Sequence, residues 1–138
     1  MGKDTTYESI NGCVFCSAIG SEAVVAKHKT VIALKDKNPV TRHHLLIVPI
    51  RHVADYFALT YEEKCHADIL ITICRKRITK LDPSVTAFNI GINCGESAGQ
   101  TIFHCHIHLI PRRDGDTPFP RGGVRGVIPA KMNYPYSK

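Results

Sequence analysis

The stretch GQTIFHCHIHLIPRR, residues 99–113, places histidines at every second position: His104, His106 and His108. In an extended strand, alternate side chains point to opposite faces, so these three imidazoles are expected on one face. The other face carries the residues that we expect in the core: Phe103, Cys105, Ile107 and Leu109. Core packing requires no row of titratable rings, so the histidine face predicts a functional site.

The segments around this stretch predict an α+β domain with a mostly antiparallel sheet of about five strands. Apolar runs predict strands, the first two paired as a hairpin, over residues 22–27, 30–35, 44–49, 85–92 and 101–111. Helical spacing after a capping box of Thr60 and Glu63 predicts one main helix over residues 60–81, which ends before Asp82-Pro83. A short helix is expected near the N-terminus.

The length of 138 residues, 43% of them hydrophobic, predicts one domain over residues 1–138, with residues 112–138 as an extended tail. No stretch reaches the roughly 18 consecutive apolar residues of a membrane span, and residues 1–10 lack the apolar run of a secretory signal. We therefore expect a cytoplasmic protein that does not bind a membrane. Its six cysteines are expected to be reduced thiols or metal ligands.

The chain is basic, with 18 Lys and Arg residues, 12 Asp and Glu residues and a net charge of +6. Basic residues gather in segments 75–80 and 112–125. This charge suits a polyanionic ligand, and it equally suits ordinary solubility.

Three imidazoles on one strand face have three plausible uses: a metal cage, a general acid–base relay, or a covalent nucleophile supported by its neighbours. Just upstream, segment 95–101, GESAGQT, offers backbone N–H groups, an amide and a hydroxyl that suit phosphate oxygens. This context favours phosphate chemistry over a metal cage or a row of histidines on a solvated edge.

The combination Gly99-Gln100-Thr101 followed by His104-x-His106-x-His108 resembles the signature of the histidine triad (HIT) family of nucleotidyl hydrolases and transferases. The resemblance covers most of the chain, because residues 36–52 are similar to the family's nucleoside-binding strand and turn. Residues 111–116 are similar to those of the branch that cleaves dinucleoside polyphosphates. The resemblance implies a HIT-like fold and cleavage at the α-phosphate of purine nucleotide conjugates, either dinucleoside polyphosphates or nucleoside phosphoramidates, with release of AMP or GMP.

Within the triad, the resemblance implies that His106 is the nucleophile and forms a nucleotidyl-histidine intermediate that water hydrolyses. It implies phosphate binding by His108, Gln100 and Thr101. His104 would assist the leaving group or help to fix the site. Histidine at position 108, where family members that transfer nucleotides usually carry glutamine, favours hydrolysis and leaves phosphorolysis open.

For the nucleoside, the resemblance implies that Asp36 accepts hydrogen bonds from the ribose hydroxyls and that His44 lines the same pocket. Asn93 and Gly99 would lie near the phosphates. Asp36 also begins the turn Asp-Lys-Asn-Pro, where aspartate is favoured for conformational reasons alone.

Recognition of the base departs from the family pattern at one position. Lys37 stands where the family often places an apolar residue that packs on the base. We therefore expect Phe15 or Ile19 to contribute instead.

The pair Cys13-x-x-Cys16 has the spacing of two zinc ligands, which is half of a site. In the zinc-bearing relatives that the N-terminal segment resembles, the other two ligands correspond to His52 and His104. The resemblance thus implies a structural Zn²⁺ ion on these four residues, with His106 free to react. The alternative is a pair of reduced thiols packed in a short turn. No organic cofactor is expected.

The sequence also bears on alternative functions and on the partners of the protein. A nucleotide-binding signalling module with slow turnover is the main alternative to the hydrolase. Nucleic-acid processing is disfavoured, because 138 residues leave little room for an additional nucleic-acid-binding region.

The resemblance also implies a homodimer. The basic tail is expected to contact polyphosphate at the mouth of the site through Arg112, Arg113, Arg121 and Arg125.

Overall fold

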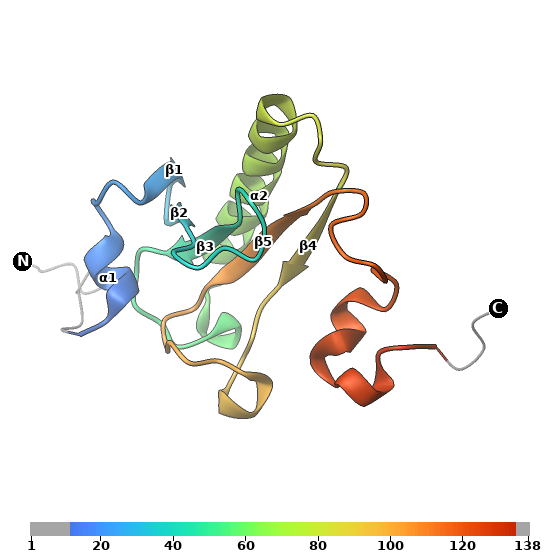
Figure 1. Ribbon diagram of the computed structural model, residues 1–138. Coiled ribbons are helices and arrows are strands. Elements are labelled where there is room, and N and C mark those ends of the chain that lie inside the picture. The colour runs from blue at the N-terminus through green and yellow to red at the C-terminus, as the bar shows by residue number, and fades with distance from the viewer. Residues whose placement is uncertain (1–11, 135–138) are drawn as a thin grey trace, which may run out of the picture.

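The structure is a computed structural model that describes residues 12–134. Its centre is a five-stranded sheet with the order β1-β2-β3-β5-β4, in which all neighbouring strands are antiparallel (Figure 1). The strands are β1 (Val24–His28), β2 (Val31–Lys35), β3 (Leu45–Pro49), β4 (Ala87–Gly91) and β5 (Ile107–Arg112). The predicted α+β class, the antiparallel sheet and the first hairpin are therefore confirmed.

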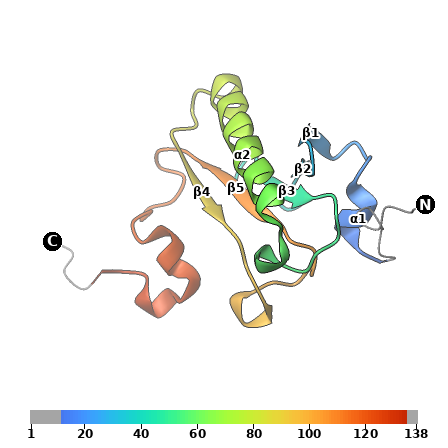
Figure 2. The ribbon, with the colours of Figure 1, turned by 180° about the vertical axis from the view of Figure 1, so that it is seen from behind.

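The longer helix, α2 (Tyr61–Leu81), covers one face of the sheet (Figure 2). It begins and ends where the sequence predicts, because the capping box of Thr60 and Glu63 is formed and Asp82 closes the last turn. Leu70, in the middle of its buried stripe, is fully covered by the strands. Among the residues that the structure describes, no helix combines the length and apolar character needed to cross a membrane.

The short helix α1 (Val14–Ala18) lies on the opposite face of the sheet (Figure 1). Phe15 of this helix packs with a cluster of buried sheet residues: Ile32, Leu34, Leu46 and Val48. Strand β3 is buried along its whole length because both of its faces are covered. His108 is paired with Leu46 across β3 and β5, so its side chain shares the α1 side of the sheet.

Strand β5 begins at Ile107, so two of the three histidines precede it. Before Ile107 the chain bends toward the segment after β3, where the Cys105 N–H donates to the carbonyl of Val53 at 2.8 Å. The predicted strand over residues 101–111 is therefore wrong for residues 101–106. The three rings still lie on one side, because Phe15 of α1 contacts both His104 and His106, and His108 shares the α1 side. Phe103, predicted in the core, is 49% exposed because it lies before this bend, while the other three predicted core residues are buried.

The segment after β5 is more compact than the predicted extended tail. It forms two 3₁₀ turns, η4 (Gly123–Val127) and η5 (Pro129–Lys131), beside edge strand β4 (Figure 1). Gly122 has φ 98°, and a Cβ atom there would meet the carbonyl oxygen of Met132 at 2.6 Å, so glycine is required for this fold. Earlier in the chain the structure also has the 3₁₀ turns η2 (Tyr56–Ala58) and η3 (Glu96–Ala98).

Candidate functional site

The ring of His106 has its tautomer set by the main chain. Its Nδ1 lies 2.9 Å from the carbonyl oxygen of His104. A carbonyl can only accept, so Nδ1 carries the proton and Nε2 keeps a free lone pair. The ring packs against Phe15 of α1, with centroids 4.9 Å apart, and lines a cavity on this face of the sheet. In the neutral ring, the nitrogen with the lone pair is therefore Nε2, on a histidine that lines the cavity.

His108 receives its orientation from a chain of hydrogen bonds. The Val40 N–H donates to Nδ1 of His44 at 3.0 Å, so the His44 proton is on Nε2. That Nε2 lies 2.9 Å from Nδ1 of His108 and 3.3 Å from a carboxylate oxygen of Asp36. Donation from His44 to His108 leaves the His108 proton on Nε2. This nitrogen can then donate to a ligand.

Burial favours the neutral form of both rings in this chain. It lowers the pKa of His44, and the nearby Asp36 carboxylate offsets this only in part. Burial, followed by the neighbouring His106 and His44, lowers the pKa of His108. Both imidazoles are therefore neutral at pH 7, as the hydrogen-bond chain requires.

The cavity next to these histidines has a volume of about 850 Å³ and lies between α1, the end of β2 and loop 93–101. Its lining includes Phe15, Asp36, Asn93, Thr101, His106 and His108. One carboxylate oxygen of Asp36 accepts from the Asn38 N–H at 2.8 Å, and the carboxylate retains lone pairs for a ligand. The volume and the mixed lining suit a small organic molecule with polar groups at one end.

Loop 93–101 is shaped by two glycines and one buried glutamine. Gly95 and Gly99 have φ of 94° and 96°, which favours glycine at both positions. The Gln100 carbonyl oxygen accepts from the Gly95 N–H at 2.8 Å, and its amide group donates to two main-chain carbonyls at 2.7 and 3.0 Å. Gln100 thus braces the loop from inside and does not line the cavity, which differs from the direct phosphate contact expected from the sequence.

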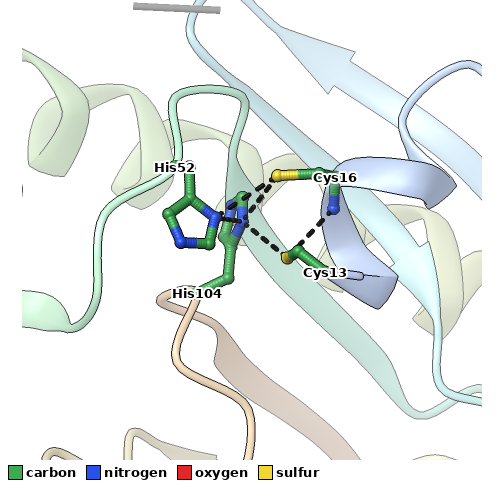
Figure 3. A group of neighbouring side chains, drawn as sticks. All are labelled: Cys13, Cys16, His52 and His104. Carbon is green, nitrogen blue, oxygen red and sulfur yellow. Dashed lines mark hydrogen bonds between the residues drawn. The ribbon is translucent and has the colours of Figure 1, made fainter. Parts of the chain in front are cut away.

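A second cluster lies beside the triad and joins three separate segments: Cys13 and Cys16 at α1, His52 after β3, and His104 before β5 (Figure 3). The Nδ1 atoms of His52 and His104 are 3.1 Å apart. The Cys16 sulfur is 3.3 Å from His52 Nδ1 and 3.6 Å from His104 Nδ1, and the Cys13 sulfur is 3.5 Å from His104 Nδ1. All four donor atoms therefore point at one another.

These distances fit a single metal ion at the centre of the cluster. Four ligands at zinc bond lengths of 2.0–2.3 Å in a tetrahedron stand roughly 3.3–3.8 Å apart, close to the separations observed here. Nε2 of His104 lies 2.8 Å from the carbonyl oxygen of Pro49 and must carry the proton, so Nδ1 offers its lone pair to the cluster. The sulfur and nitrogen donors can thus hold a metal ion without rearrangement of the chain.

The structure brings the predicted site residues together, but His44, Gln100 and His104 are buried and lie outside the cavity lining. His104 is fully buried, with both nitrogens committed, so it favours the fixing role over contact with a leaving group. His44 stands behind His108 and is absent from the cavity lining, while Ile19 packs in the core next to Phe15. Sequence reasoning missed the orienting carbonyl of Pro49, because main-chain atoms leave no signal in a residue pattern.

The site can be compared with known proteins. Residues 20–115 match the HIT domain family. The chain is 36% identical over 107 residues to a HIT-like protein of Mycobacterium tuberculosis, covering 75% of this chain and 74% of that protein. It is also 36% identical over 124 residues to an adenylylsulfatase of Arabidopsis thaliana, and over 99 residues to an AP-4-A phosphorylase of M. tuberculosis. These alignments cover 83% and 70% of this chain but only 59% and 49% of the two enzymes.

Solved structures agree with the fold, and one of them is a zinc-bound protein. A HIT family protein from Bacillus anthracis superposes with a TM-score of 0.71 at 35% identity, over 80% of each chain. A Zn-bound histidine triad family protein from Mycobacterium smegmatis superposes with a TM-score of 0.62 at 30% identity, over 77% of this chain and 78% of that one. The predicted HIT-like fold is thereby confirmed.

Proposed function

The chain belongs to the HIT domain family, and from this premise we propose that it hydrolyses purine nucleotide conjugates at the α-phosphate through a nucleotidyl-His106 intermediate. The observation that carries this proposal is the free Nε2 lone pair of His106 at the wall of the cavity, next to the proton-bearing Nε2 of His108. A nucleophile and a hydrogen-bond donor thus face the same space. The names of the two related enzymes, an adenylylsulfatase and an AP-4-A phosphorylase, support a nucleotide substrate.

In the first step, the His106 Nε2 lone pair attacks the α-phosphorus and forms an N–P bond. The bond from phosphorus to the leaving group breaks, and the departing group keeps the electron pair; the nitrogen of a phosphoramidate also takes up a proton from solvent and leaves as ammonia. His108 donates its Nε2 proton in a hydrogen bond to a phosphate oxygen, where negative charge develops. Thr101 and the main-chain N–H groups of loop 93–101 supply further donors, while Gln100 keeps that loop in place.

In the second step, water attacks the phosphorus of the nucleotidyl-histidine. The P–N bond breaks, its electron pair returns to Nε2 of His106, and the water proton passes to solvent. The product is a nucleoside monophosphate. Because the His104 carbonyl holds Nδ1–H throughout, the imidazole regains its starting tautomer after each cycle.

The nucleoside of the substrate is placed on the α1 side of the cavity. Asp36 accepts hydrogen bonds from ribose hydroxyls, and Phe15 supplies the aromatic surface next to the base. Lys37 also lines the cavity, and Asn93 and Gly99 lie where the phosphates approach the triad. The base itself is proposed to be a purine, with AMP or GMP as the product.

The second cluster is proposed to hold a structural Zn²⁺ ion. A closed set of Cys13, Cys16, His52 and His104 leaves no open coordination position for a substrate, so the ion would supply rigidity. Its effect reaches the nucleophile through His104, whose side chain is in the cluster and whose carbonyl orients His106. The zinc-bound relative supports the choice of metal.

A homodimer is proposed as the working form, with edge strand β4 available for a second sheet. Ile90 on this strand is 52% exposed, which is unusual for a large apolar side chain in a sheet. A cytoplasmic location is also proposed, because the six cysteines form no disulfide among residues 12–134.

The proposed function is tested by His106→Ala, measured as release of AMP from diadenosine tetraphosphate and from adenosine 5′-phosphoramidate. We expect turnover to fall by at least about a thousandfold on both substrates while AMP still binds in calorimetry. His28→Ala, on the far edge strand β1, is the matched control and should behave as wild type. Full activity of His106→Ala would refute the nucleophile, and tight AMP binding without turnover by the wild type would favour the signalling module.

A further inference from the structure

Loop 36–44 carries two of the groups that the proposed mechanism uses. Asp36 stands at its start, directly after β2, and His44 stands at its end, directly before β3. The Val40 N–H donates to Nδ1 of His44 at 3.0 Å and so leaves the His44 proton on Nε2. That nitrogen lies 2.9 Å from Nδ1 of His108, on β5. The position of the loop relative to β5 therefore decides whether the hydrogen bond from His44 to His108 is made.

The loop is attached to the end of β5 at the residues just before His44. The Thr41 hydroxyl donates to the carbonyl of Pro111 at 2.6 Å. A guanidinium nitrogen of Arg113 donates to the carbonyl of Arg42 at 3.2 Å. Both partners belong to β5 or follow it directly. The strand that carries the acceptor of the relay thus also holds the loop that carries its donor.

Asp82, which caps the C-terminus of α2, makes a third attachment. One of its carboxylate oxygens accepts from Arg113 at 2.8 Å and lies 3.7 Å from Nε2 of His43. The other accepts from the N–H and the hydroxyl of Ser84, at 3.0 and 2.6 Å. Hydrogen bonds from Ser84 and Arg113 hold the pKa of the Asp82 carboxyl below its ordinary value. His43 has φ 74°, which a residue other than glycine rarely adopts, so this loop conformation depends on contacts from outside.

Arg113 joins these contacts through one guanidinium group. The Nη2 atom that donates to the Arg42 carbonyl also donates to Asp82, and Nε donates to the Ser84 hydroxyl at 3.2 Å. The Arg113 side chain is 18% exposed, and Arg113 is absent from the lining of the cavity beside α1. These contacts differ from the polyphosphate contact expected from the sequence, because they direct the guanidinium toward loop 36–44.

We propose that Arg113 and Asp82 are positioning residues of the reaction, which hold loop 36–44 so that His44 keeps the proton of His108 on Nε2. This inference rests on the proposed function and deepens it, because it extends control of the phosphate-binding histidine to an ion pair outside the cavity. The ion pair is attached next to His44, whereas Asp36 follows β2 at the other end of the loop. Its loss should therefore act on kcat more than on KM.

The first test is Asp82→Asn, measured as kcat and KM on adenosine 5′-phosphoramidate. Asparagine keeps an oxygen for Ser84 but replaces the oxygen that accepts from Arg113 with an NH₂ group, which only donates. We expect kcat to fall about tenfold, with KM within about twofold of wild type. Asp68→Asn, at an exposed position of α2, is the control for the lost charge and should behave as wild type. A loss confined to KM, or no loss, would overturn the inference.

Arg113 is tested by two substitutions. Arg113→Lys retains a cationic donor for Asp82 and for the Arg42 carbonyl, so kcat should stay within about threefold of wild type. Arg113→Met keeps an apolar stem and removes every donor, so kcat should fall about tenfold on adenosine 5′-phosphoramidate and on diadenosine tetraphosphate alike. A loss confined to diadenosine tetraphosphate would assign Arg113 to polyphosphate binding and would overturn the positioning role.

A double substitution shows whether the ion pair acts through His44. His44→Phe removes the donor to His108, so adding Asp82→Asn to it should change kcat by no more than about twofold. If the two effects multiply to a loss of about a hundredfold, the ion pair acts on another part of the protein and the inference is wrong.

The tautomer of His108 provides a readout that needs no turnover. In protein labelled with ¹⁵N-histidine, wild-type His44 and His108 should each show one tautomer, with the proton on Nε2. In Asp82→Asn and Arg113→Met with wild-type circular dichroism, the His108 signals should shift toward a mixture of both tautomers. An unchanged single tautomer would overturn the inference. A wild-type protein that turns over no substrate refutes the proposed hydrolase, while the comparison of tautomers still decides the role of the ion pair.

Discussion

At the scale of single residues, main-chain atoms fix one nitrogen in each of three rings of the site: His104, His106 and His44. The Pro49 carbonyl fixes His104, the His104 carbonyl fixes His106, and the Val40 N–H fixes His44. A carbonyl only accepts and an amide N–H only donates, so each contact sets a tautomer without a charged partner. The lone pair on His106 is thus a property of the backbone conformation.

His108 depends on a side chain, and this dependence yields a prediction for His44→Phe. The substitution removes the donor to His108 Nδ1, so the proton of His108 is no longer held on Nε2. We expect kcat to fall about tenfold with little change in KM, because ground-state contacts to the nucleotide remain.

Steady-state kinetics on adenosine 5′-phosphoramidate measure this effect, with His28→Phe as the control for loss of a histidine elsewhere. The far-ultraviolet circular dichroism of both variants should match that of wild type. An unchanged kcat in His44→Phe would show that His108 needs no partner to hold its proton.

At the scale of elements, the first turn of α2 holds the turn that follows β3. Both carboxylate oxygens of Glu63 accept from Arg51, at 3.0 and 2.7 Å, and one of them also accepts from the Thr60 N–H. Arg51 is next to His52, so this contact joins the start of the helix to one member of the cysteine and histidine cluster. Burial alone would raise the pKa of Glu63, but the hydrogen bonds from Arg51 and Thr60 hold it below its ordinary value.

This pKa shift predicts how stability changes in acid. Glu63 binds a proton more readily in the unfolded chain than in the folded one, so its contribution to stability is present above the unfolded pKa of about 4.3. It is lost as the pH falls through the lower folded value. Glu63→Gln should therefore lower the free energy of unfolding at pH 7 by roughly 1–3 kcal/mol and flatten its decline below pH 5.

Urea unfolding between pH 3 and pH 7 measures both effects. Glu62→Gln is the matched control, because Glu62 is the exposed neighbour in the same helical turn and makes no contact with Arg51. If the two variants lose equal stability, the Arg51 contact contributes nothing specific.

At the scale of the whole molecule, the cysteine and histidine cluster joins segments that lie far apart in the sequence. Cys13 and His104 are 91 positions apart, and His52 stands between them in the chain (Figure 3). A metal ion bound there would connect α1, the turn after β3 and the segment before β5. Binding of this kind stabilises the folded state only, since the unfolded chain does not hold the ligands together.

Metal removal is therefore expected to lower the thermal stability of the protein. Purified protein should contain about one zinc ion per chain by elemental analysis, and a strong chelator should lower Tm by about 5 °C or more. Cys16→Ser should lose the metal and lose the response to chelator, whereas Cys65→Ser, on α2 outside the cluster, should retain both. Protein without zinc, even after incubation with the metal, would leave Cys13 and Cys16 as packed thiols.

The sequence was sufficient to predict features with a local signature. The capping box located α2, two closely spaced apolar runs located the first hairpin, and the triad motif brought His106 and His108 to one cavity. Features that depend on distant contacts were not predictable. The bend before Ile107 is accompanied by a hydrogen bond to Val53, and the segment after β5, which has no hydrophobic period, folds against β4.

The position of His104 also has a consequence for the order in which the protein assembles. Helix α2 is built from contacts between near neighbours and can form early, whereas the carbonyl that orients His106 is in place only when the beginning, middle and end of the chain have met. The reactive nitrogen is thus completed last. During refolding from denaturant, the helical circular dichroism signal should recover before catalytic activity does. The return of activity would then indicate that the chain has reached its final topology.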